Sequence, residues 1–166
     1  FDGSMYAGRL PTESGELMFW LFARDEPTFD DTLLIWLNGG PGCSSFTGLF
    51  VEHGPVTMSR RPAGFYGTDP HDPLEYNEYS WTQASMMLFV EQPHGTGFST
   101  GSFPKDEKEL ARNFYIFLEN LYEVFDGSAK DLKSKDLYVF GESYAGMYVP
   151  SIAHYIYSQG SSKFRL

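Results

Sequence analysis

The sequence predicts an α/β fold whose later half forms a parallel sheet. Apolar runs at 32–37, 85–93 and 136–140 have the length and residue types of strands. From position 85 onward, strand and helix patterns alternate, which is typical of parallel strands joined by crossover helices. An earlier run at 16–24 predicts another strand, which could be antiparallel.

Two helices follow from the spacing of apolar residues. A long helix is predicted at 106–125, where the apolar residues fall on one face. Acidic residues occupy its first turns, next to the positive end of the helix dipole. Apolar residues from Met147 to Ile156 predict a second helix. The apolar positions of the long helix are Leu110, Phe114, Phe117, Leu118, Leu121 and Phe125.

Composition excludes several classes of protein. The 166 residues are 42% hydrophobic, which is enough for the core of about one domain. With 12 basic and 22 acidic residues the net charge is -10, which argues against a nucleic-acid partner or an anionic membrane surface. No apolar stretch approaches the ~20 residues of a membrane span, and the start at Phe1 lacks a signal-peptide pattern. We interpret this start as that of a mature or trimmed product.

Ser143 lies on the predicted bend between the strand at 136–140 and the second helix. Gly141 and Ala145 are small residues on either side of this bend. A sharp strand-to-helix turn with small neighbours is the arrangement called a nucleophile elbow, which exposes a serine hydroxyl near a helix N-terminus. An ordinary tight loop is the alternative.

A glycine-rich segment after the strand at 32–37 favours the elbow. Gly39 and Gly40 let the backbone come close to a ligand and aim its N–H groups outward. An oxyanion hole combines such a loop with the N–H of the residue after the nucleophile, here Tyr144. Alone, the segment would also suit a tight turn.

Six motifs together carry a resemblance to a known family. In chain order they are MYAGRLP, WLNGGPGCSS, GLFVEHGP, YSW, VEQPHGTGFST and GESYAGMYVP. With them the chain closely resembles the serine carboxypeptidases, which have an α/β-hydrolase fold and remove C-terminal residues from peptides. The resemblance implies that residues 1–166 are the N-terminal portion of one catalytic domain. It further implies a peptide substrate with a free C-terminus, no cofactor or metal, and a location in the secretory pathway, a vacuole or lysosome, or outside the cell.

The resemblance also implies roles for individual residues. Ser143 is the expected nucleophile, and the N–H groups of Gly40 and Tyr144 form the expected oxyanion hole. The expected carboxylate-binding residues are Asn38 and Glu142, supported by Glu52 and Trp36.

Glu142 is the least usual of these residues, because a charged carboxylate beside the serine would oppose the oxyanion. A protonated Glu142 can instead donate to the substrate carboxylate. We expect Glu142 to be partly buried near Glu52, which would raise its pKa.

Two further positions depart from the family, Glu91 in place of the usual aspartate and His94 in place of a small or apolar residue, and we expect both at the pocket rim.

A histidine base and its acid partner are not evident. In this fold both follow the nucleophile, but the 23 residues after Ser143 contain one histidine and no acid. His154 lies 11 positions along the same helix, about 16 Å away, and His53, His71 and His94 precede the serine. We expect the base and acid in a remaining C-terminal portion, on the same chain or on a disulfide-linked one.

Cys43 is the single cysteine and cannot pair within the chain. We expect a disulfide to a cysteine outside it, as is often found at this position in the family, and a buried free thiol is the alternative.

The sequence predicts a serine-type carboxypeptidase that forms an acyl-enzyme on Ser143. The alternatives are a carboxypeptidase-like acyltransferase and an inactive fragment with a binding or structural role. Suitable residues at both carboxylate-binding positions, Asn38 and Glu142, favour the peptidase.

Overall fold

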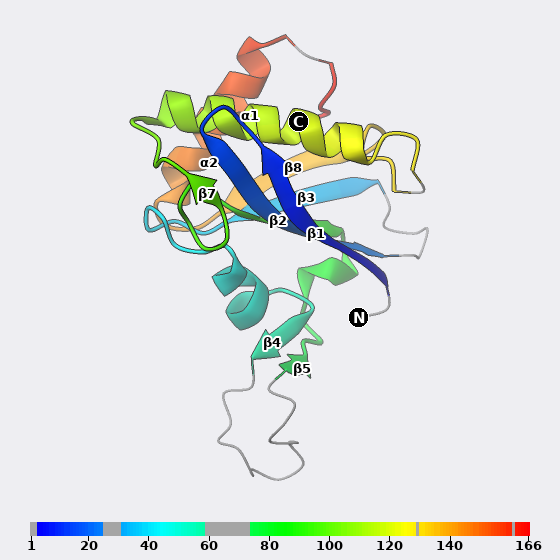
Figure 1. Cartoon of the computed structure of the whole chain (residues 1–166). Coiled ribbons are helices and arrows are strands. Elements are labelled where there is room, and N and C mark those ends of the chain that lie inside the picture. Colours follow the sequence, from blue (N-terminus) through cyan, green and yellow to red (C-terminus); the bar gives the residue numbers. More distant parts are fainter. Residues whose placement is uncertain (1–2, 25–30, 59–73, 129, 161) are drawn as a thin grey trace.

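A mixed sheet of six strands forms the centre of the molecule (Figure 1). It is seen in a computed structural model that describes residues 3–24, 31–58, 74–128, 130–160 and 162–166. The strand order is β1-β2-β6-β3-β8, and the short β7 pairs with β2. These strands are β1 Gly3–Pro11, β2 Gly15–Arg24, β3 Thr32–Leu37, β6 Met86–Glu91, β7 Thr100–Gly101 and β8 Asp136–Gly141, and a separate pair is formed by β4 Val56–Met58 and β5 Leu74–Tyr76.

The pairing directions confirm the predicted α/β sheet. β3 is parallel to both β6 and β8, whereas β2 is antiparallel to β1 and β6. β6 is buried along its whole length because strands cover both of its edges and side chains cover both of its faces. It ends at Glu91, earlier than predicted, because the chain turns there and Pro93 has no N–H to continue the ladder. β1, β4, β5 and β7 were not predicted, since they are short or lie at an edge where no long apolar run is needed.

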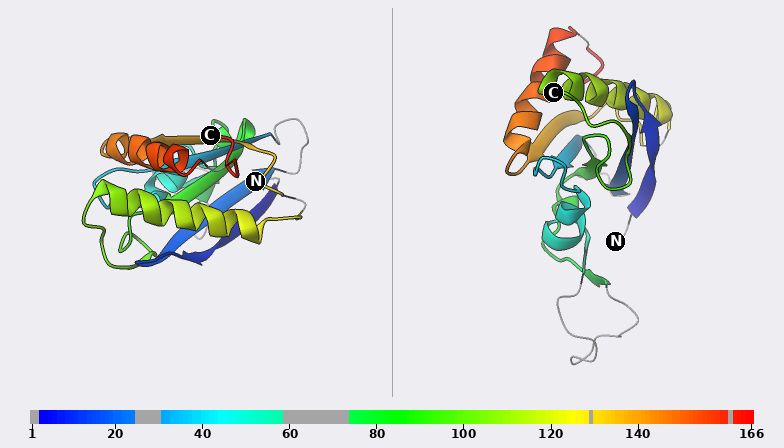
Figure 2. Two further views of the ribbon diagram at one scale, coloured as in Figure 1. Left: turned by 90° about the horizontal axis from the view of Figure 1, so that it is seen from above. Right: turned by 60° about the vertical axis from the view of Figure 1, so that its left-hand side comes forward.

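Both helices lie on one face of the sheet (Figures 1 and 2). α1, Glu107–Val124, begins at the Asp106 cap, whose carboxylate accepts a 2.8 Å hydrogen bond from the Glu109 N–H. All six predicted apolar positions of this helix are buried, which confirms its predicted face. α2 spans Ala145–Ser158 and packs against α1. Of the helices in the described ranges, none is long and apolar enough to cross a membrane.

The opposite face carries short turns instead of long helices. A π-helical turn, η2 Gly48–Glu52, and a 3-10 turn, η3 Trp81–Gln83, lie there together with β4 and β5 (Figure 2). The two faces of the sheet bury separate apolar clusters. Residues at the edge where the strands end can therefore contact either the cluster under the helices or the cluster on the opposite face. The second cluster consists of Phe22, Trp36, Phe46, Leu49, Met87 and Phe89.

Candidate active site

Ser143 sits on a sharp bend between β8 and α2. Its φ is +55°, the one positive φ of a non-glycine residue in the described ranges. This backbone conformation is costly for a residue with a Cβ, and the surrounding structure must hold it in place. A Cβ at Gly141 would lie 2.6 Å from the Cβ of Ala145 and 2.6 Å from the carbonyl oxygen of Leu37, so both flanking residues have to be small. The predicted strand, bend and helix are therefore present, and the serine is exposed at the bend.

The glycine-rich loop packs directly against this bend. β3 and β8 are parallel neighbours, with Leu37 opposite Gly141, so the segments after both strands leave the same edge of the sheet. A Cβ at Gly39 would lie 2.5 Å from the Tyr144 nitrogen and 3.0 Å from the Ser143 Cβ. Only glycine permits this approach of the two backbones.

The two expected oxyanion donors lie on these adjoining segments. Gly40 has a φ of +108°, in the region that favours glycine. Neither the Gly40 N–H nor the Tyr144 N–H donates to an acceptor among the described residues. Available N–H groups on such segments can stabilise the negative charge of a tetrahedral intermediate when they point toward the serine hydroxyl.

Asn38 is held by hydrogen bonds that fix the direction of its amide. Its side chain is buried, and its Oδ1 accepts from Trp36 Nε1 at 2.8 Å and from the Gly48 N–H at 3.1 Å. Its Nδ2 therefore faces the other way and donates to Glu142 Oε1 at 2.9 Å. The structure thus brings together three of the four predicted carboxylate-binding residues.

Glu52, the fourth residue, interacts with both Asn38 and Glu142 and has a raised pKa. Burial raises the pKa of the Glu52 carboxyl, the Glu142 carboxylate raises it further, and a hydrogen bond from Asn38 lowers it in part. Glu142 is exposed in this chain, on the bend after β8, and its partial burial in the complete enzyme stays a prediction. Glu52 lies on η2 beside His53, and only 30% of its side chain is exposed.

His53 is a neighbour of this cluster that the sequence analysis did not assign. Its ring packs between Trp36 and Trp81, with ring centroids 4.2 Å and 4.4 Å away. Nδ1 is 3.7 Å from Glu52 Oε2, but burial lowers the pKa of His53 to about 4, so the ring is neutral in mildly acidic solution. The only sequence feature that could have indicated this position of His53 is that it directly follows Glu52.

No histidine in the described part of the chain hydrogen-bonds to Ser143. His53 lies among aromatic rings, His94 lies beside Thr12, and His154 is exposed on α2. His71 lies outside the described residues. The described ranges also hold no cluster of three potential metal ligands.

Glu91 and His94 are not at a pocket rim, which corrects the expectation for both. Glu91 is fully buried at the end of β6, where its carboxylate accepts from the Ser44 hydroxyl and from the Phe98 N–H. His94 is 1% exposed, and its Nε2 lies 2.6 Å from Thr12 Oγ1. Both residues hold loops in place beneath the surface. Cys43 in the glycine-rich loop is exposed in this chain.

The mixed sheet, the bend at Ser143 and the facing glycine loop are features of the N-terminal part of an α/β-hydrolase fold. A model of the serine carboxypeptidase family matches residues 1–165, and the chain belongs to this family. The crystal structure of Kex1(delta)p, a prohormone-processing carboxypeptidase from Saccharomyces cerevisiae, matches with a TM-score of 0.83 and 31% identity, over 99% of this chain and 37% of that one.

Curated relatives match over most of this chain. A carboxypeptidase Y homolog from Arthroderma benhamiae is 40% identical, over 94% of this chain and 29% of the relative. The vacuolar serine-type carboxypeptidase ATG42 from Saccharomyces cerevisiae is 44% identical, over 87% of this chain and 26% of the relative. The chain therefore spans less than a third of the length of these relatives.

Replacing Gly39 by alanine tests the contact between loop and bend. The new Cβ would push the loop away from the Tyr144 nitrogen, and loss of one oxyanion donor lowers kcat about 100- to 1,000-fold. We expect a fall of this size in kcat/KM of the full-length enzyme for an N-blocked dipeptide. Gly146→Ala is the matched control, because a Cβ there meets nothing within 4 Å. Wild-type turnover by Gly39→Ala would contradict the proposed oxyanion hole.

Proposed function

We propose that this chain is the N-terminal portion of the catalytic domain of a serine-type carboxypeptidase that releases C-terminal amino acids from peptides. The observation that carries the proposal is the position of Ser143, at a φ of +55° beside the Gly39 backbone and two available N–H groups. Family membership supports it, and so do the relatives named as carboxypeptidases.

The proposed reaction begins with attack of Ser143 Oγ on the last peptide carbonyl. The carbonyl oxygen becomes an oxyanion that accepts from the N–H groups of Gly40 and Tyr144. The peptide C–N bond then breaks, the terminal amino acid leaves as a protonated amine, and the rest of the peptide remains as an ester on Ser143. Water hydrolyses this ester. We place the histidine base and its acid partner in residues beyond this chain, in the usual order for this fold.

Recognition of the free C-terminus is assigned to the cluster of Asn38, Glu142, Glu52 and Trp36. Asn38 Nδ2 is a directed donor, because the Trp36 indole fixes the opposite end of the amide. The Glu52 and Glu142 carboxyls interact, and the raised pKa of Glu52 lets the cluster keep a proton at a higher pH than an ordinary glutamate would. That proton can be donated to the substrate carboxylate.

The cellular location of the protein is proposed from the name of one relative and from the net charge. One relative is named as vacuolar, and the net charge of -10 suits an acidic compartment. We propose the secretory pathway, a vacuole or lysosome, or the extracellular space, without a nucleic-acid or membrane partner.

Hydrolysis by the full-length enzyme tests the proposed reaction. We expect release of the C-terminal amino acid from an N-blocked dipeptide and loss of this activity in Ser143→Ala, because no other described residue replaces the nucleophile. The readout is the amount of free amino acid, with Ser151→Ala as a control on α2. Acyl transfer from a sugar ester to an alcohol, without peptide hydrolysis, would favour the acyltransferase instead. No reaction with either substrate would favour an inactive protein.

The pH dependence tests carboxylate recognition. Below the raised pKa of Glu52 the cluster holds a donor proton, and as pH rises through this pKa the proton is lost and two carboxylates repel the substrate. Losing one charge-assisted hydrogen bond of ~2–3 kcal/mol predicts roughly 30- to 150-fold weaker recognition at the higher pH. The C-terminal amide of the same dipeptide has no carboxylate and should not show this fall.

The measurement is a pair of kcat/KM profiles against pH, for the acid and the amide. Glu52→Gln keeps a donor and removes the group with the raised pKa, so we expect a flatter profile for the free acid. Parallel wild-type profiles for acid and amide would exclude this role of the cluster.

Cys43 supports a connection to residues outside this chain. It is exposed in the loop beside the oxyanion donors, and we propose that it forms a disulfide there. Non-reducing peptide maps of the native full-length protein should show Cys43 linked to another peptide. A Cys43 peptide that iodoacetamide labels without reductant would refute the disulfide.

A further inference from the structure

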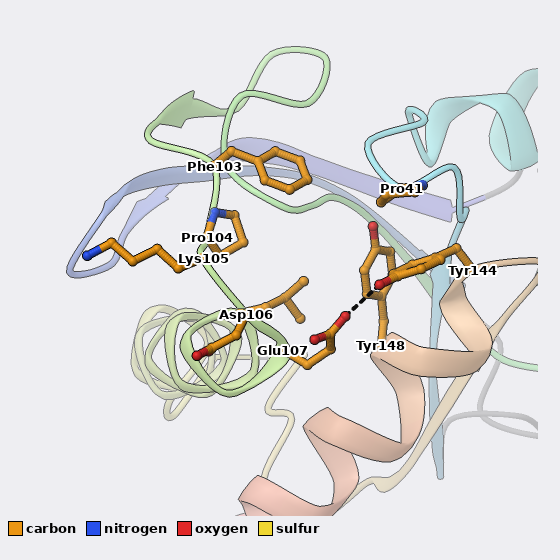
Figure 3. Close-up of a pocket in the computed structure, with 9 residues that line it drawn as sticks. Pro41, Phe103, Pro104, Lys105, Asp106, Glu107, Tyr144 and Tyr148 are labelled. Carbon is orange, nitrogen blue, oxygen red and sulfur yellow. Dashed lines mark hydrogen bonds between the residues drawn. The ribbon is translucent and has the colours of Figure 1, made fainter.

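A cavity lies beside the bend, on the side away from the carboxylate-binding cluster. Its volume is about 250 Å³, below the ~300–1,000 Å³ of pockets that enclose drug-sized ligands, so it suits a single side chain. Figure 3 shows it between the start of α1, the glycine-rich loop and the start of α2. The residues that line it include Pro41, Phe103, Glu107, Leu110, Tyr144 and Tyr148.

The position of this cavity relative to Ser143 indicates which part of a peptide it receives. Leu110 and Tyr148 belong to the core under the two helices, whereas Trp36 belongs to the cluster on the other face of the sheet. Ser143 is flanked by Glu142, which bonds to Asn38, and by Tyr144, which lines the cavity. If the leaving amino acid binds at Asn38 and Glu142, the residue whose carbonyl is attacked lies on the cavity side.

The cavity is lined by both apolar and polar side chains, and among the polar ones Glu107 is a directed carboxylate. Glu107 points toward Tyr144, whose hydroxyl donates to Glu107 Oε1 at 2.6 Å (Figure 3). Asp106 is engaged in capping α1, and Lys105 points away from the cavity in the same view. Glu107 forms no ion pair with a lysine or arginine of the described residues.

The bond to Tyr144 leaves Glu107 with acceptor capacity. An ionised carboxylate has two oxygens, and the tyrosine hydroxyl occupies one lone pair of Oε1. Glu107 also lies in the first turn of α1, where the helix dipole stabilises a negative charge. A cation entering the cavity would therefore meet a half-buried, fixed carboxylate near the side chains of Phe103, Pro41 and Leu110.

We infer that Glu107 is a specificity-determining residue that makes the enzyme prefer a basic side chain in the penultimate residue of its peptide substrate. The inference rests on the proposed carboxypeptidase function and adds a substrate class to it. Phe103, Pro41 and Leu110 contact the methylene groups of a lysine or arginine side chain. The Glu107 carboxylate pairs with the charged end of that side chain.

The test compares three N-blocked dipeptides that share a C-terminal alanine and differ in the penultimate residue: lysine, its uncharged analogue norleucine, and glutamate. For the full-length wild-type enzyme we expect kcat/KM to be about tenfold higher for lysine than for norleucine, and lowest for glutamate. Glu107→Gln keeps an acceptor for Tyr144 but removes the charge, so the lysine-to-norleucine ratio should fall to about one. Glu107→Lys should favour glutamate over lysine.

Two further variants separate charge from structure. Tyr144→Phe removes the hydroxyl that fixes Glu107 but keeps the charge of Glu107, so the preference for lysine should weaken without disappearing. Glu123→Gln changes an exposed carboxylate at the far end of α1 and should leave the ratio unaltered. A wild-type lysine-to-norleucine ratio near one, an unchanged ratio in Glu107→Gln, or a loss of preference in Tyr144→Phe would each overturn the inference while peptide hydrolysis continues. Absence of hydrolysis of all three peptides by the wild type would overturn the proposed function as well.

Discussion

The parallel pairing of β3 with β8 is the constraint on which the site depends. It places the ends of two strands at one edge of the sheet, so that segments 104 positions apart in the chain come into hydrogen-bond contact. Gly39 then packs against the Tyr144 nitrogen at a distance that no side chain would allow. The serine at positive φ and the available N–H groups are held together by this backbone contact, which gives the nucleophile a prearranged electrostatic environment.

The two faces of the sheet give the site two different sides. On one face Trp36 donates a hydrogen bond to Asn38, and Asn38 in turn donates to Glu142. Asn38 also bonds to Glu52, whose pKa is raised. On the other face the start of α1 brings Glu107 to Tyr144. A peptide bound across Ser143 would meet a proton donor for its terminus on one side and an acidic cavity on the other.

The sequence predicted the parts of this arrangement that have local or periodic signals. The bend at Ser143 follows from a strand, a helix and the small residues Gly141 and Ala145, and all of these can be recognised in one short segment. The buried face of α1 follows from apolar spacing. The proposed oxyanion hole depends on two motifs that lie far apart in the sequence, and we considered them together because this fold uses both.

The burial of single charged groups could not be predicted in the same way. Glu142 is exposed while Glu91 is fully buried, although Glu91 ends β6 and Glu142 directly follows β8. The difference arises from loops that fold over one strand end and not the other, which depends on tertiary packing rather than on local sequence. The bond between Glu107 and Tyr144 likewise joins two helices whose relative position has no marker in the sequence.

The central claim is that Ser143 carries the acyl group during turnover. The most direct measurement is mass spectrometry of peptides from the full-length enzyme, quenched in acid during hydrolysis of an activated N-blocked amino acid ester. The acyl mass should be found on the peptide that contains Ser143 and should disappear when hydrolysis is complete. An acyl group on a different residue during productive hydrolysis would contradict the account.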